Sequence, residues 1–195
     1  VESDNVNTTD TDVDNYGVSL YTNYDMGQQM FLNAQLGYAR NDIDITRHDA
    51  GGAGLVANGS TDSNQYSGKL ALGRDYMQEY GMTVTPVVSA AYTYLDTDGY
   101  QETGTGVLNA VASSTMHALN VGIGGTASWK MKNADGSVMK PSIRAGYAYD
   151  VTGDRVETTS SFTGDPAATT FRTTGADPAR HQFTGGCVTQ RGRFL

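Results

Sequence analysis

Apolar and polar side chains alternate with a period of two along seven segments of the chain, and this period is typical of half-buried β-strands. In residues 16–25, for example, Val18 and Leu20 fall on one face while Ser19 and Asn23 fall on the other. The seven segments are residues 16–25, 30–39, 66–75, 84–94, 119–129, 139–149 and 180–186. No segment has a persuasive helical period. The predicted fold class is therefore all-β.

The connections between these segments alternate between short and long. Short turns are expected near 26–28, 78–82 and 132–137, and long polar loops at 45–62, 98–113 and 151–179. Strands joined in this way form an up-and-down antiparallel meander, with its turns at one end and its loops at the other. This asymmetry is typical of transmembrane β-barrels of the outer membrane, whereas a soluble sandwich has less regular loop lengths and Greek-key crossings.

The aliphatic face of the predicted strands carries aromatic residues at both of its ends. At the loop end these residues are Tyr16, Tyr38, Tyr66, Tyr92, Tyr94, Tyr147 and Tyr149. At the turn end they are Tyr24, Tyr76 and Trp129. Aromatic side chains favour the boundary between water and hydrocarbon, so two such belts around an aliphatic band predict a surface that faces lipid. The opposite face is mostly glycine and small polar residues, which suit a wet or crowded barrel interior.

Composition and charge exclude several classes of function. The 21 acidic residues outnumber the 13 basic ones and give a net charge of −8, which argues against a nucleic-acid partner. The single cysteine rules out a disulfide framework, and the three histidines are too far apart in sequence for a zinc motif. The longest uncharged stretch, residues 103–129, is too polar to cross a membrane as a helix. We find no catalytic or cofactor-binding motif, so we expect no enzyme, no cofactor and no metal site.

Several strand segments resemble the autotransporter β-domain in their residues and in their order along the chain. The first of them reads Tyr-Gly-Val-Ser-Leu-Tyr-Thr-Asn-Tyr. The resembling segments are residues 16–24, 31–42, 86–94, 141–150 and 183–186. Together they extend the resemblance from about Asn15 to Gly186.

The resemblance implies a twelve-stranded barrel in the outer membrane of a Gram-negative bacterium, with this chain supplying about strands four to ten. It also implies a translocator of type V secretion, which anchors and exports a passenger domain through a pore that holds the passenger's tether. The implied partners are outer-membrane lipid, the protein's own passenger domain and the barrel-assembly machinery. Residues 1–186 are then a partial barrel domain. Residues 187–195 are an atypical C-terminal tail, because Arg191 and Arg193 stand where the family continues with a strand.

Five charged residues fall on the polar face of the predicted strands, namely Asp25, Lys69, Asp75, Lys140 and Arg144. In a barrel this face lines the lumen, so two roles are open to these side chains. They can brace the wall as a network of salt bridges, or they can line the pore and contact the tether.

Two other functions stay open on the sequence alone. A stand-alone surface adhesin or porin-like barrel would act through its long loops. A soluble secreted β-domain would bind carbohydrate through its exposed tyrosines. In the soluble alternative the aliphatic face turns inward, whereas in a membrane barrel it turns outward to lipid.

Overall fold

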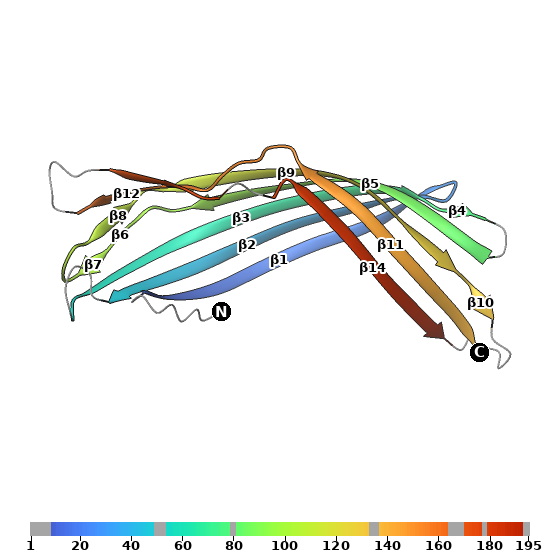
Figure 1. The fold of residues 1–195 in the computed structure, drawn as a ribbon, viewed down its shortest axis with the longest axis horizontal. Helices are drawn as coiled ribbons and strands as arrows, with labels where there is room; N and C mark the ends of the chain where they lie inside the picture. The colour runs from blue at the N-terminus through green and yellow to red at the C-terminus, as the bar shows by residue number, and fades with distance from the viewer. Residues whose placement is uncertain are drawn as a thin grey trace.

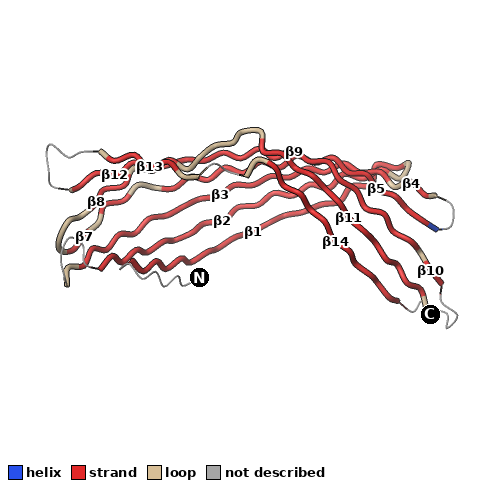
Figure 2. The backbone as a smooth tube through the Cα atoms, in the orientation of Figure 1, coloured by secondary structure: helices blue, strands red, loops and turns tan. Residues whose placement is uncertain are grey.

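The computed structural model describes residues 9–48, 54–78, 81–132, 137–163, 170–176 and 179–192, and antiparallel β-strands dominate it (Figures 1 and 2). Its long strands are β1 (Thr9–Gly27), β2 (Met30–His48), β3 (Val56–Arg74), β5 (Met82–Thr97), β9 (Ser114–Trp129), β11 (Val138–Asp150) and β14 (His181–Gly192). Each long strand pairs with the next one along the chain, in the order β1-β2-β3-β5-β9-β11-β14. The predicted all-β meander is confirmed.

The main sheet is a curled half-barrel. In Figure 1, β11 and β14 cross at a steep angle to β1, β2 and β3. Glycines permit this curvature, because Gly124 of β9 lies opposite Gly146 of β11 and a Cβ atom on Gly124 would lie only 2.9 Å from the carbonyl oxygen of Ala145. Within the described residues, β1 pairs only with β2 and β14 pairs only with β11.

A tight turn joins β1 to β2 at what we name the turn end of the sheet. Gly27, Gln28 and Gln29 have φ values of 76°, 52° and 65°, in the left-handed region that glycine adopts at little cost. The carboxylate of Asp25 accepts a hydrogen bond of 2.8 Å from the Gly27 backbone N–H. The predicted turn is therefore present. The turn predicted at 132–137 falls largely on residues 133–136, which lie outside the described residues.

At the opposite end, which we name the loop end, the strands are longer than the alternation of apolar residues predicts. The predicted loop 45–62 is too long, because β2 continues to His48, β3 begins at Val56 and the two strands stay paired in one unbroken register. Both faces of this extension are rich in polar residues. Such a segment shows no apolar period, although its backbone pairing is the same as that of the rest of the strand.

The predicted loops 98–113 and 151–179 also contain strands. The short elements there are β6 (Tyr100–Gln101), β7 (Thr103–Gly104), β8 (Asn109–Val111), β12 (Glu157–Phe162) and β13 (Phe171–Thr174). A second, four-stranded sheet has the order β13-β12-β8-β6, and β7 pairs with β3. Two more short strands, β4 (Tyr76–Met77) and β10 (Met131–Lys132), extend the main sheet at the turn end. The loop prediction fails here because the pairing joins segments that are distant in sequence.

The side-chain pattern predicts that the last long strand ends at Gly186, but the strand continues beyond this residue. β14 pairs with β11 from His181, opposite Tyr149, to Gly192, opposite Val138. It thus crosses the predicted boundary between residues 186 and 187 without a break in the ladder. Backbone pairing with a neighbouring strand needs no amphipathic pattern in the added strand.

Several of the most buried side chains of the described residues lie at the loop end. Ala57, Ser63 and Glu102 are 1%, 4% and 5% exposed. Arg47 donates two hydrogen bonds to the Glu102 carboxylate, at 3.2 Å from Nε and 2.6 Å from Nη2. The Glu102 carboxylate also accepts the Asn109 backbone N–H at 2.7 Å. This paired, hydrogen-bonded geometry is what a buried carboxylate requires.

The surroundings of Glu102 change its pKa in two opposing ways. Burial by itself would raise the pKa of this carboxyl group, because it disfavours the charged form. The hydrogen bonds from Arg47 and Asn109, together with the charge of Arg47, outweigh burial and hold the pKa of Glu102 below its ordinary value. Burial raises the pKa of Tyr100, which lies beside this pair.

Replacement of Arg47 with alanine should lower the free energy of local opening at the loop end by roughly 2–4 kcal/mol, because it leaves a buried carboxylate without its partner. Hydrogen exchange of the amides in β6 and β8 measures this change. Since the folded-state pKa of Glu102 is lowered, the stabilisation is complete above the ordinary glutamate pKa and is lost as the pH falls through the lowered one. Replacement of Arg40, which forms an exposed ion pair with Asp62, should leave the exchange rates nearly unchanged, because water screens that pair. This account would be contradicted if the exchange rates of these amides changed neither on substitution of Arg47 nor at low pH.

Candidate functional site

The convex face of the main sheet is aliphatic and uncovered. Leu20 of β1, Leu36 of β2 and Ile123 of β9 are 71%, 65% and 65% exposed. Other large apolar residues of this face with exposed side chains are Val18, Leu70, Val88, Val121 and Ile143. Contiguous apolar surface of this kind is rare on a soluble monomer and indicates contact with lipid or with another molecule. The soluble alternative, in which the aliphatic face turns inward, does not fit this arrangement.

Aromatic rings form a continuous row on the convex face near the loop end. The ring of Tyr38 lies 5.2 Å from that of Tyr66, Tyr66 lies 6.3 Å from Tyr94, and Tyr94 lies 5.0 Å from His117. These rings come from four successive strands, β2, β3, β5 and β9, because cross-strand register places them side by side. Tyr92 belongs to the same group, since its hydroxyl hydrogen-bonds Nδ1 of His117 at 2.8 Å.

A second aromatic group continues the row on β11 and β14. Tyr147 lies 6.0 Å from the ring of His181 and hydrogen-bonds its Nδ1 atom at 2.8 Å, and Tyr149 lies 5.3 Å from the same ring. Phe183 lies 5.2 Å from Tyr147. Sequence reasoning did not place His117 and His181 among the aromatic residues, although both continue the alternation of their strands and share its face.

The remaining predicted aromatic residues lie apart from these groups. Tyr16 of β1 is exposed at the loop end of the convex face, opposite Arg40 of β2. At the turn end, Tyr24 and Tyr76 are exposed. The guanidinium carbon of Arg74 lies over the Tyr76 ring, 5.1 Å from the ring centroid. Trp129 pairs with Met82 near the turn end of β5. That these rings mark a membrane boundary stays a prediction.

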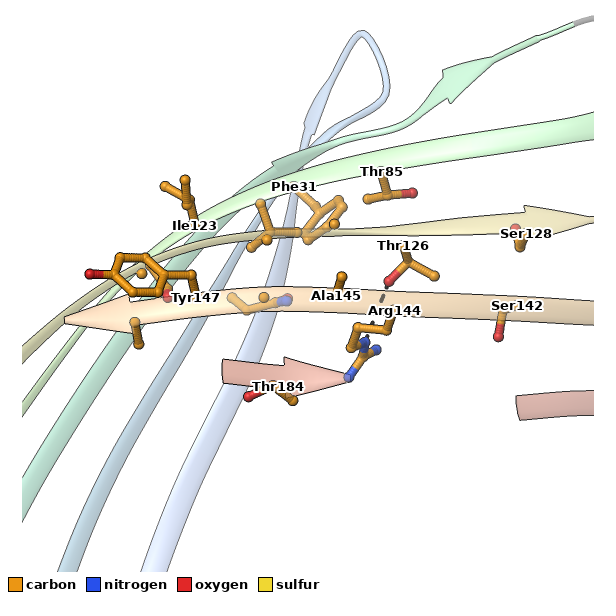
Figure 3. A pocket seen from close by; sticks show the side chains of 18 of the residues that line it. Phe31, Thr85, Ile123, Thr126, Ser128, Ser142, Arg144, Ala145, Tyr147 and Thr184 are labelled. Carbon is orange, nitrogen blue, oxygen red and sulfur yellow. Dashed lines mark hydrogen bonds between the residues drawn. The ribbon is translucent and has the colours of Figure 1, made fainter. Parts of the chain in front are cut away.

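The concave face encloses an open hollow of about 820 Å³ between β2 and β14 (Figure 3). Small or polar side chains line much of it, including Asn33, Ser89, Thr126 and Thr184. Phe31 is an exception, and its ring covers Gly73 on the neighbouring strand, where a Cβ atom would have no room. The two faces of the sheet therefore differ in character, apolar outside and mostly polar inside.

The five predicted lumenal charges lie on or beside this hollow. Lys69, Asp75, Lys140 and Arg144 line it, and Asp25 pairs with the lining residue Phe31 across the turn that joins β1 to β2. Their contacts are local, since Asp75 accepts a hydrogen bond of 2.5 Å from Thr85 and Arg144 donates one of 3.4 Å to Thr126. Across the described ranges, no ion pair joins any two of the five. The structure brings the five to one face, but not into a bracing network.

The described residues offer no assembled site for a metal ion, since no three or more of their histidine, cysteine, aspartate and glutamate side chains gather suitably. Cys187 is free and exposed on β14. No helix of the described part is long and apolar enough to cross a membrane.

Known proteins resemble this chain over most of its length. Outer membrane protein B of Rickettsia rickettsii is 27% identical over 161 residues, which cover 79% of this chain and 10% of that protein. Outer membrane protein B of Rickettsia typhi is 25% identical over 164 residues, which cover 80% of this chain and 10% of that protein. The chain thus spans about a tenth of the length of the curated relatives it matches.

A solved structure shares the fold. The translocator domain of the autotransporter NalP from Neisseria meningitidis superposes with a TM-score of 0.59 at 18% sequence identity, and the match covers 96% of this chain and 68% of that one. The fold of the half-barrel is therefore similar to that of this translocator domain. The match of residues 2–189 to the family described as the autotransporter β-domain completes the assignment. The chain belongs to the autotransporter β-domain family, whose place is the bacterial outer membrane.

Proposed function

We propose that this chain forms part of the wall of an outer-membrane pore that anchors and exports a passenger domain, as a translocator of type V secretion. The opposite character of the two faces of the sheet carries this proposal. An exposed aliphatic face suits hydrocarbon, and a mostly polar concave face suits a water-filled conduit. The proposed role is that of a conduit and an anchor, without catalysis.

Closure of the pore requires partners for the outer edges of β1 and β14. Hydrocarbon does not tolerate unpaired strand edges, because it cannot hydrogen-bond the exposed N–H and C=O groups. We therefore assign further strands to these edges, outer-membrane lipid to the convex face, and the barrel-assembly machinery to the insertion step. The passenger's tether then lies against the concave face. Lys69, Lys140 and Arg144 are the basic side chains of this face that would contact it.

A photo-crosslinking residue at Ser89 should capture the passenger during export by the full-length protein. Ser89 lines the hollow, whereas the adjacent Val88 is exposed on the convex face and serves as the matched control. Crosslinked adducts, separated by size and identified by mass spectrometry, are expected at Ser89 and not at Val88. Equal capture at the two positions, or capture at Val88 alone, would refute a conduit through the concave side.

Arginine substitutions should distinguish the two faces. Arginine at Leu36 or Ile123 should destabilise the folded barrel by about 2–4 kcal/mol, because the side chain would enter hydrocarbon near the membrane midplane. Arginine at Gln35, which precedes Leu36, or at Ser89, which lies opposite the residue before Ile123, should destabilise the barrel only mildly, because both side chains lie on the concave side. Heat-resistant migration and urea unfolding of the full-length protein in detergent measure the difference. If both faces tolerate arginine equally, the lipid-facing assignment is wrong.

Cysteine labelling of intact cells should show the orientation of the sheet. In a Cys187→Ser background, a membrane-impermeant maleimide should modify cysteine at Ser60 or Gln101, which are exposed at the loop end. Cysteine at Met77 or Met131, exposed at the turn end, should react only after the cells are lysed. This outcome follows if the loops lie outside the cell and the turns face the periplasm. The reverse labelling pattern would contradict this orientation and place the turn end outside the cell.

A further inference from the structure

An open groove crosses the convex face in the half of the sheet that is nearer the turn end. It has a volume of about 820 Å³ and is lined by residues of β2, β3, β5, β9 and β11, together with Tyr76 of β4. Most of these residues are apolar, and Arg74 is the one charged residue among the described residues that line the groove. A cleft of this size, with an apolar lining and few polar groups, is typical of a site for a small molecule.

The groove forms because a row of small residues lies beside a row of large ones. The large residues, which lie opposite one another on four successive strands, are Leu72, Val88, Ile123 and Tyr147. The small residues of the next row toward the turn end are Pro86, Gly125 and Ala145. Successive rows on one face of a sheet are about 6.6 Å apart, since a strand rises about 3.3 Å per residue. The row of small residues therefore leaves a trough across the sheet that suits an extended hydrocarbon chain.

Arg74 lies at the β3 end of this trough, and its guanidinium carbon is 5.1 Å from the centroid of the Tyr76 ring. Arg74 is exposed, and it forms no ion pair with any carboxylate of the described residues. The adjacent Asp75 lies on the concave side, where it accepts a hydrogen bond from Thr85. A guanidinium on a surface that meets lipid is costly unless it reaches the headgroup layer, where its planar fork fits the oxygens of a phosphate.

We propose that this groove binds one phospholipid, with its phosphate on the Arg74 guanidinium and one acyl chain in the trough beside Val88 and Ile123. This inference rests on the proposed function, because it requires the convex face to meet lipid, and it adds a specific lipid site to that face. The positive charge of Arg74 complements the phosphate, and the apolar trough complements the chain. Because Arg74 lies toward the turn end, the lipid belongs to the periplasmic leaflet.

Two photoreactive lipids test the site in the full-length protein, reconstituted in phosphatidylcholine vesicles. The first is a phosphatidylglycerol with a diazirine on one acyl chain. The second is a diacylglycerol with the same chain and no phosphate, which serves as the matched control. Mass spectrometry of the labelled peptides should show that the phosphatidylglycerol labels Val88 and Ile123 of the groove more strongly than Leu20 and Leu36, which lie outside it on the same face. The diacylglycerol should label the four positions alike.

A charge substitution tests the phosphate contact. Arg74→Gln should lower phosphatidylglycerol labelling of the groove by roughly five-fold, because a basic residue near the membrane surface attracts an anionic lipid. Arg40→Gln is the matched control, since Arg40 is exposed on the same face and its charge is already paired with Asp42 and Asp62. Labelling of the groove in this control should equal that in the parent protein.

A substitution that fills the trough tests the site of the acyl chain. Ala145→Phe places a ring among the small residues of the trough and should lower phosphatidylglycerol labelling of Val88 and Ile123 to the level seen outside the groove. Ala90→Phe is the matched control, because Ala90 is also exposed on the convex face but does not line the groove. Labelling should persist in the control. Heat-modifiable migration of each variant shows whether its barrel has folded.

The outcomes separate the lipid site from the proposed function. Equal labelling across the convex face by both lipids overturns the site and leaves the lipid-facing assignment standing. A groove that excludes both lipids while the rest of the face is labelled has a protein occupant, which also overturns the site. Labelling of Ser89, on the concave face, as strong as that of Val88 overturns the lipid-facing assignment itself. The comparison of the two lipids needs no variant, so it decides the question even if a substitution prevents folding.

Discussion

The structure depends on the antiparallel hydrogen-bond ladder, which satisfies the backbone of each long strand through its neighbours. Lipid offers no hydrogen bonds to an exposed N–H or C=O group, and each unsatisfied group costs several kcal/mol there. In the part of the chain that the structure describes, the long strands from β1 to β14 are paired side by side, and the outer edges of β1 and β14 have no partner strand. Because the ladder satisfies the backbone, the side chains of the two faces can differ in polarity. The convex face is aliphatic, and the concave face carries mostly small polar residues.

In the proposed barrel, a sheet with lipid on one side and a lumen on the other has little need of a hydrophobic core. Among the described residues, only Ala57 and Ala71 are buried apolar side chains. Close burial occurs instead at single polar side chains, such as Glu102 at the loop end, which pairs with Arg47, and Ser137 beside β11. A buried ion pair is seldom a net source of stability, but its loss is costly because one charge remains unpaired. Such a pair suits a contact that specifies one position of a segment.

The curvature of the sheet connects its construction to its use. Gly124 and Gly146 face each other where β9 meets β11, and a Cβ atom on Gly124 would lie too close to the Ala145 backbone. Their lack of side chains lets the sheet bend, and the bend encloses the hollow that Lys69, Lys140 and Arg144 line. Outside, rows of tyrosine and histidine rings follow the register near the loop end. The same alternation thus produces the aliphatic convex surface and the mostly polar concave one.

The period of two along segments such as 16–25 and 30–39 determined the strands, their order and the two faces, because each of these depends only on local alternation and turn chemistry. It also placed Lys69 and Arg144 on the concave side. What alternation could not predict were the polar extension of β2 to His48, the continuation of β14 to Gly192, and the second sheet. In these parts the apolar pattern is weak or absent, and the backbone is paired with segments distant in sequence. Only the tertiary structure decided that Arg47 would meet Glu102 and that His117 and His181 would join the tyrosines, because these contacts depend on strand register and on the pairing of β7 with β3.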